Sequence, residues 1–102
     1  MEKEKNQIKI LFEHLSIEAF VKYYKIFQKY SNSRSNKEIY IEFDSNCENW
    51  TKKSYTSRAS KGKKIFRLNL EIDALLYIIN ESNEKKISKT IKDEALIIYK
   101  SL

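Results

Sequence analysis

The apolar positions of the first thirty residues recur at three- and four-residue intervals, the spacing of one face of an α-helix. The ten positions that follow this spacing are Ile8, Leu11, Phe12, Leu15, Ile17, Phe20, Val21, Tyr24, Phe27 and Tyr30. This pattern predicts helix from about residue 7 to 30, either continuous or divided at Ser16, a residue type that favours helix N-caps. We expect residues 1–7 to be flexible, the apolar face to lie in the core, and residues 31–36 to form a polar loop.

Residues 37–43 instead alternate between apolar and polar side chains, with Ile39, Ile41 and Phe43 on one side. A period of two predicts a short β-strand. The stretch that follows is ambiguous. Ser45 and Glu48 have the spacing of a capping box, which favours a short helix over about 46–54. Residues 50–56 are also rich in β-formers, so a strand is the alternative.

Residues 63–70 alternate as well, with Phe66, Leu68 and Leu70 facing one way. We therefore expect a second strand here, paired with residues 55–59 in an antiparallel hairpin whose tip is 57–64. Gly62 is the only glycine of the chain. At a tight hairpin turn, it would supply the positive φ that other residues rarely adopt.

Two further helices are predicted at the C-terminal end, with Asn69 as the cap of the first and a turn at residues 83–86 between them. The buried stripe of the first is expected to be Ile72, Leu75, Leu76 and Ile79. The second has more apolar surface than one face requires, so we expect a homodimer contact there. Its residues would be Ile91, Ala95, Ile98 and Leu102. A helix hairpin within one chain is the alternative.

The positive charge of the chain is concentrated in one segment. Residues 51–70 contain seven Lys or Arg and no acidic residue, whereas the rest of the chain contains 13 cations and 14 anions. The net charge of +6 therefore comes from this segment alone. Because self-repulsion opposes such a concentration, a polyanionic partner is the simplest explanation, and nucleic acid is the commonest one. A solvated loop that only keeps the protein soluble is the alternative.

The residue types of the chain argue against several function classes. The length of 102 residues fits one domain, 1–102, and no apolar run approaches the roughly 18 residues of a membrane span. A lone histidine, His14, and a lone cysteine, Cys47, cannot form a zinc site, and no phosphate-binding or hydrolase motif is present. We therefore expect a cytoplasmic protein that is not an enzyme and has no cofactor, metal, membrane or small-molecule substrate. Lysine far outnumbers arginine, which suggests an AT-rich bacterial, plasmid or phage gene.

The expected order of elements resembles the winged helix-turn-helix family over about residues 8–70. Residues 39–43 match its first strand, 46–54 its recognition helix and 55–70 its wing. The resemblance implies an α+β fold with N-terminal helices, a small antiparallel sheet carrying the basic hairpin, and two C-terminal helices. It also implies sequence-preferring binding to double-stranded DNA. The chain as a whole is similar to relaxosome accessory proteins of clostridial conjugative plasmids, which implies a dimer that binds an origin of transfer and assists a relaxase.

Residues 63–102 also resemble a ribbon-helix-helix unit, the fold of many transcriptional repressors. In that family, two chains pair their strands and read the major groove with outward side chains. Those would be Ile65, Arg67 and Asn69 here, with the amides of 88–90 on a phosphate. A plasmid or phage inhibitor that docks on a host protein is a rival of another class.

Lysines are expected to contact phosphates, and Arg58 and Arg67 to make bidentate bonds to phosphate or guanine. The candidate DNA contacts are Asn49, Lys52, Lys53, Ser57, Arg58, Ser60, Lys61, Gly62, Lys63, Lys64 and Arg67.

Overall fold

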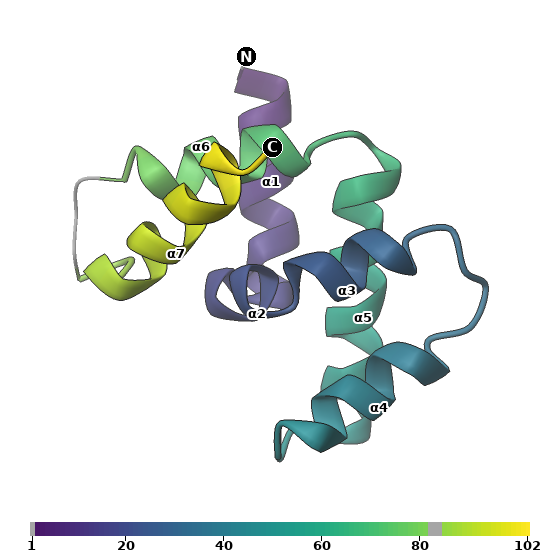
Figure 1. Ribbon diagram of the computed structural model, residues 1–102. Helices are drawn as coiled ribbons and strands as arrows, with labels where there is room; N and C mark the ends of the chain where they lie inside the picture. Colours follow the sequence, from purple (N-terminus) through teal and green to yellow (C-terminus); the bar gives the residue numbers. More distant parts are fainter. Residues whose placement is uncertain (1, 82–84) are drawn as a thin grey trace.

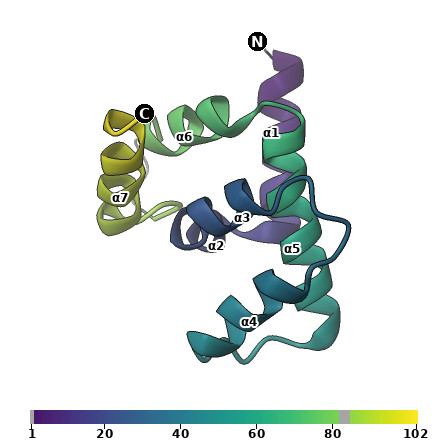
Figure 2. The same ribbon diagram turned by 45° about the vertical axis from the view of Figure 1, so that its right-hand side comes forward.

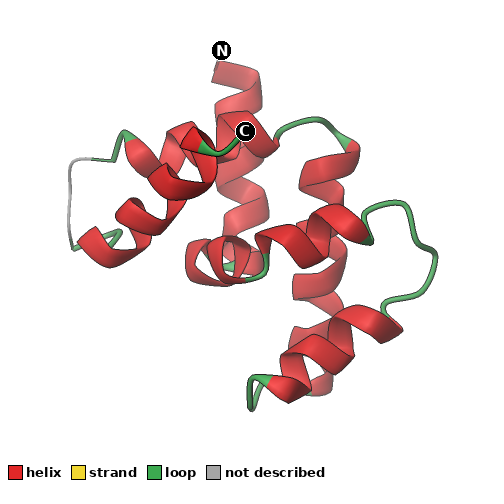
Figure 3. Cartoon of the chain, viewed as in Figure 1, coloured by secondary structure: helices red, strands yellow, loops and turns green. Residues whose placement is uncertain are grey.

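The computed structural model describes residues 2–81 and 85–102. Over these residues, α-helices joined by loops and turns are its only regular secondary structure (Figures 1 and 3). The helices are α1 (Glu2–Leu15), α2 (Ile17–Lys22), α3 (Tyr24–Lys29), α4 (Lys37–Ser45), α5 (Lys52–Arg67), α6 (Glu71–Ile79) and α7 (Lys89–Lys100). No β-strand occurs in the described residues. The predicted α+β fold was therefore wrong, and neither a wing nor a ribbon exists.

The predicted helix over about residues 7–30 is confirmed, and of its two alternatives the chain has the break at Ser16, with a second break at Tyr23. Helix α1 already begins at Glu2, and the flexibility of residues 1–7 stays a prediction. The Oγ of Ser16 accepts a hydrogen bond from the backbone N–H of Ala19 at 3.1 Å and so caps α2. Ser16 itself has φ 73°, which turns the chain sharply between α1 and α2. The polar segment 31–36 is a loop, as predicted.

Residues 37–45 form α4 instead of a strand because the buried pair in this segment is Ile39 and Phe43. These two residues are four apart, share one helix face and are both fully buried, whereas Ile41 is 52% exposed. The ring of Phe43 packs edge-on against those of Tyr23 and Trp50, at 4.9 and 5.1 Å between centroids. This aromatic packing favours the helical period over the alternating one.

One motif ends α4 and another begins α5. Neither is the predicted capping box of Ser45 and Glu48. Cys47 adopts φ 58°, while the N–H of Glu48 donates to Phe43 O at 3.1 Å and that of Cys47 to Asp44 O at 3.0 Å. This pattern is a Schellman C-cap. Residues 46–51 then connect the helices, and the Oγ1 of Thr51 caps α5 by accepting from Ser54 N at 3.1 Å. The predicted helix over 46–54 was therefore wrong.

The predicted hairpin is a single 16-residue helix, α5, and Gly62 lies in its middle without a positive φ. The helix ends at Asn69, which has φ 56°, and the N–H of Leu70 donates to Ile65 O at 2.9 Å. Asn69 therefore terminates α5 and does not cap α6, contrary to the prediction. The apparent alternation over 63–70 was misleading, since the adjacent residues Ile65 and Phe66 are both buried while Leu68 is 41% exposed.

The core lies where α1 packs against α5 and α6, with α2 and α3 between α5 and α7 (Figure 2). Helices α6 and α7 are both present as predicted, and they pack against each other. The buried stripe of α6 is Ala74, Leu75 and Ile78, so its register differs from the predicted one. The predicted turn at 83–86 lies partly outside the described residues. Along the described chain, no helix is long and apolar enough to cross a bilayer.

Candidate nucleic-acid interface

Helix α5 has one buried face and one solvent-facing face. The buried face consists of Ala59, Gly62, Ile65 and Phe66, which pack toward α1 and α3. On the opposite side, polar residues recur at helical spacing. They are Lys53, Ser57, Ser60, Lys64 and Arg67, with Lys61 beside them. We call these six residues the α5 polar face.

The cations of this face are not neutralised by nearby acids. Lys53, Lys64 and Arg67 are exposed, and Lys61 is half-exposed. None of them lies within ion-pair distance of a carboxylate among the residues that the structure describes. Lys52 adds a further exposed charge at the first turn of the helix. The sequence therefore located the positive charge correctly, although a helix rather than a hairpin presents it.

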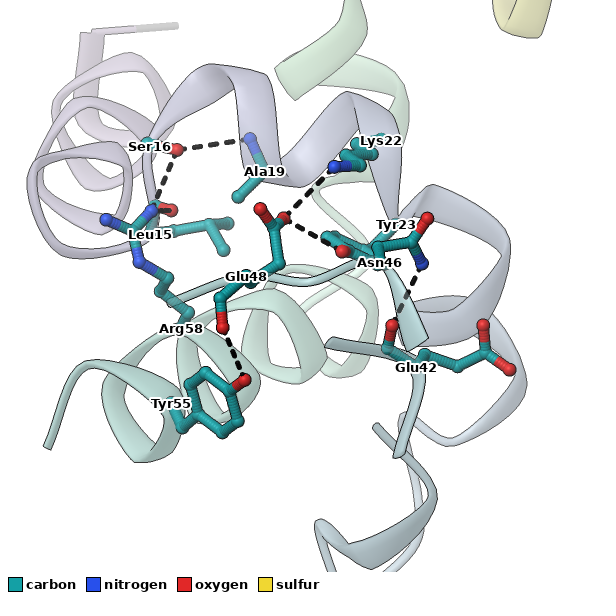
Figure 4. A network of polar contacts seen from close by, with 10 residues as sticks. All are labelled: Leu15, Ser16, Ala19, Lys22, Tyr23, Glu42, Asn46, Glu48, Tyr55 and Arg58. Atoms are coloured by element: carbon teal, nitrogen blue, oxygen red, sulfur yellow. Dashed lines mark hydrogen bonds and ion pairs between the residues drawn. The ribbon is translucent and has the colours of Figure 1, made fainter. Parts of the chain in front are cut away.

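Arg58 points away from this face and holds α5 to the junction between α1 and α2 (Figure 4). Its Nη1 donates to Leu15 O at 2.7 Å and to Ser16 Oγ at 3.0 Å, and its Nε donates to Ser54 Oγ at 2.9 Å. The guanidinium carbon also lies 4.2 Å from the centre of the Trp50 ring, a cation–π distance. Because these donors are used within the chain, we do not place Arg58 in the interface.

The connection 46–51 is fixed in place by Glu48 (Figure 4). Its Oε2 accepts from Lys22 Nζ at 3.2 Å and from Tyr23 OH at 2.8 Å, and its backbone oxygen accepts from Tyr55 OH at 2.7 Å. Burial, together with the hydrogen bond to Glu48, raises the pKa of Tyr23 well above its ordinary value. A hydrogen bond to Asp44 and desolvation raise the pKa of Tyr55 to about 12. This network links the first turns of α5 to the end of α2 through the connection 46–51.

Two other predicted contacts, Gly62 and Lys63, are buried, and Lys63 is only 5% exposed. The Nζ of Lys63 donates to Ser33 O at 2.8 Å and to Asn36 Oδ1 at 2.6 Å. Desolvation, with a smaller effect from nearby Arg67, lowers the pKa of Lys63. Asn49 is exposed in the connection that leads into α5.

The sequence analysis missed two cations, Arg34 and Lys37, in and after the loop that Lys63 holds. Both are exposed. Residues 29–37 contain Lys29, Arg34 and Lys37 and no acid, a signal of the same kind as that of 51–70. The sequence analysis assigns these residues to the end of a helix, a polar loop and the start of a strand, and gives none of them a role in binding.

The predicted dimer seam of α7 faces mainly into its own chain. Ala95 is fully buried, and Ile91 and Ile98 are partly buried against the core. Leu102 is 61% exposed, and the most exposed large apolar residue of α7 is Ile97, at 68%. These residues therefore support the helix pair within the chain, and the homodimer stays a prediction.

A groove of about 410 Å³ lies between α2, α3 and α7. Its lining includes Val21, Tyr24, Ile26, Ile97 and Ile98, with charged residues at its edges. Among the described residues, no group of three or more His, Cys, Asp and Glu is placed to hold a metal ion. The charged residues of the groove are Lys22, Lys25 and Glu94.

No family model, curated protein or solved structure matches this chain. The functional argument therefore depends on the α5 polar face and its surroundings.

Proposed function

We propose that this protein binds double-stranded DNA by placing the α5 polar face in the major groove. The observation that carries the proposal is the row of cations along an exposed face of α5, which contains no acid and whose cations have no carboxylate partner among the described residues. A helix of 16 residues is about 24 Å long, and the major groove, about 12 Å wide, admits an α-helix. Long cationic side chains on such a helix reach phosphates on the walls of the groove.

The order of α4, the connection 46–51 and α5 supports this orientation. Helix-turn-helix proteins present their recognition helix in the same order of elements, a first helix, a short connection and a second, exposed helix. The connection is somewhat longer here than the usual three or four residues. Glu48 and Arg58 fix the start of α5 on both sides, so the face would be preorganised for binding.

The side chains of the face suggest a division of roles. Lys53, Lys61 and Lys64 would contact phosphates without reading sequence. Ser57 and Ser60 are short donors, and Arg67 is the only arginine of the face, with a fork that matches a guanine edge. We therefore propose a modest sequence preference. A place at an origin of transfer beside a relaxase stays a prediction of the sequence alone.

The test is a titration of the purified chain against duplex DNA, including its own upstream sequence, at several salt concentrations. Affinity should fall steeply as salt rises, because bound lysines displace counterions. Lys53→Ala and Lys64→Ala should each weaken binding to all duplexes and lower the salt slope by about 1. The matched control is Lys100→Ala, an exposed lysine on α7, on the other side of the molecule from α5 (Figures 1 and 2).

Undetectable binding to every duplex would contradict the proposal. Docking on an acidic surface of another protein would then be the better explanation of the α5 polar face. Binding that Lys100→Ala weakens as much as Lys64→Ala would also contradict it, because the contact would then follow net charge and not this face.

A further inference from the structure

Lys63 is an unusual residue for its position, because a lysine is rarely buried without a carboxylate partner. Its ammonium group is bound to a backbone oxygen and an amide oxygen, and it forms no ion pair among the described residues. Its charged and titratable neighbours are Arg67, Tyr40 and Glu38. Burial of an ammonium group is unfavourable, so an apolar side chain would be expected to stabilise α5 better at this position.

The two acceptors of Lys63, Ser33 and Asn36, belong to the loop between α3 and α4. They lie on either side of Arg34 in the sequence, so Lys63 ties both ends of the short segment that carries this arginine to α5. The loop is also braced internally. Ser33 Oγ accepts from Ser35 N at 3.2 Å, and Ser35 Oγ accepts from Lys37 N at 3.1 Å.

Lys63 is the residue before Lys64 of the α5 polar face and lies one helical turn from Arg67. The loop that it holds is therefore fixed along one flank of that face. The loop runs beside α5 in Figure 2, where it joins α3 to α4. Arg34 and Lys37, both exposed, add two cations to this segment, and Glu38, the next residue, is a charged neighbour of Lys63.

We propose that the loop 31–36 is a second phosphate-binding element, with Arg34 as its contact and Lys63 as its positioning residue. The proposal rests on the proposed function and deepens it. A helix in the major groove has a sugar–phosphate backbone on each side, and a cationic loop fixed beside the helix meets one of them. Arg34 suits this role because its fork binds phosphate oxygens in pairs. Lys37, at the start of α4, adds a second charge beside it.

The test measures DNA affinity and its salt slope for five variants, one of which is a double variant. Arg34→Ala should weaken binding about five- to tenfold at 0.1 M salt and lower the slope by about 1, equally on all duplexes. Arg34→Lys should keep the slope near that of the wild type. Lys63→Met and Asn36→Ala should each reproduce most of the loss of Arg34→Ala, although neither side chain contacts DNA in this proposal. Lys63→Met combined with Arg34→Ala should weaken binding little further, because both changes remove the same contact.

Hydrogen exchange tests the positioning role of Lys63 in the absence of DNA. In folded Lys63→Met, the amides of residues 33–37 should exchange faster than in the wild type, while those of α5 stay protected. If Lys63→Met does not fold, Asn36→Ala removes one of the two hydrogen bonds between Lys63 and the loop without altering α5.

The outcomes separate the two proposals. Wild-type affinity and slope in Arg34→Ala, while Lys64→Ala still weakens binding, would overturn the loop and leave the α5 polar face. Fully additive losses for Lys63→Met and Arg34→Ala would overturn the positioning role. Absence of any effect of the α5 variants would instead overturn the proposed function.

Discussion

Gly62 of α5 lies directly against the aromatic ring of Phe27 of α3. A Cβ atom at position 62 would be 2.6 Å from three atoms of that ring, closer than Cβ contacts in proteins. Phe27 is fully buried among other core residues, so its ring has little room to move aside. The only glycine of the chain is therefore required by the close approach of two helices and not by a turn.

Gly62→Ala should destabilise the protein even though alanine favours helix. The helix propensity gain is about 1 kcal/mol, and overpacking against the Phe27 ring typically costs about 1–3 kcal/mol. We expect a net loss of up to about 2 kcal/mol in the free energy of unfolding, measured by urea denaturation. Ser60→Ala, on the exposed side of the same helix, should leave stability unchanged or slightly higher. A Gly62→Ala protein more stable than the wild type would contradict the contact.

Arg58→Ala should reduce stability and not DNA contact. It removes a cation–π pair with Trp50 and two hydrogen bonds to the α1–α2 junction. We expect a loss of about 2–4 kcal/mol in the free energy of unfolding. Arg58→Lys should recover little of this loss, because an ammonium group cannot stack and donate in the same geometry. Unchanged stability with a lower salt slope of DNA binding would instead place Arg58 in the interface.

Stability should fall in alkaline solution partly through Tyr55. Its pKa is raised from 10 to about 12, chiefly by a hydrogen bond to Asp44, so folding favours the neutral phenol. This contribution is complete below pH 10 and is lost as pH rises from 10 to 12. Denaturant midpoints across this range should therefore fall less steeply for Tyr55→Phe than for the wild type.

Tyr55→Phe should retain some alkaline dependence, because the pKa of Tyr23 is raised as well. Tyr99→Phe, which removes an exposed phenol from α7, is the control and should follow the wild-type curve. If Tyr55→Phe and the wild type lose stability in parallel between pH 10 and 12, the hydrogen bond to Asp44 is absent in solution.

Long segments with helical spacing were predictable from the sequence, and short ones were not. Residues 7–30 contain ten apolar positions at helical spacing, too many to fit another period. Residues 37–43 are too few to separate the two periods, since Ile39, Ile41 and Phe43 satisfy alternation while Ile39 and Phe43 also share a helix face. Only the aromatic neighbours of Phe43, which are distant in sequence, decide between the two.

The same limit applies to the interface. Charge concentration is a property of composition, so the sequence located the basic segment at 51–70. Which cations face solvent depends on the register of α5 against the core, and that register directs Arg58 and Lys63 inward. The sequence predicts Lys63 to be a phosphate contact, because nothing in the neighbouring residues distinguishes it from Lys64. Its partners, Ser33 and Asn36, lie some thirty residues earlier in the chain.

Ile97 and Ile98 are neighbours on α7 with different environments. Substitutions at the two positions therefore test stability and association separately. Ile98 packs against the core, whereas Ile97 is 68% exposed. Ile98→Asp should therefore lower the free energy of unfolding by several kcal/mol, because it buries a charge. Ile97→Asp should leave it nearly unchanged.

Light scattering on the same two variants tests the predicted homodimer. If α7 mediates a dimer, its exposed residues must form the contact, so Ile97→Asp should halve the mass of a dimeric wild type without unfolding it. A wild-type protein that is monomeric at high concentration, or a dimer that survives Ile97→Asp, would contradict an α7 interface.

Arg67 is the residue of the α5 polar face best suited to read a base. Lys53, Lys61 and Lys64 present point charges, whereas Arg67 presents two parallel donors that match O6 and N7 of guanine. Arg67→Lys keeps the charge and removes the fork. The salt slope should therefore stay that of the wild type, while discrimination between the preferred duplex and a duplex with one changed G·C pair should fall by about 1–3 kcal/mol.

Arg67→Ala should lose both the discrimination and about one unit of slope. Lys64→Ala is the matched control on the preceding turn, since it should lower the slope without altering discrimination. Equal losses of affinity for preferred and random duplexes in Arg67→Lys would mean that Arg67 only contacts phosphate. Any sequence preference would then have to come from Ser57, Ser60 or the shape of the DNA, because the other cations of the face carry no fork.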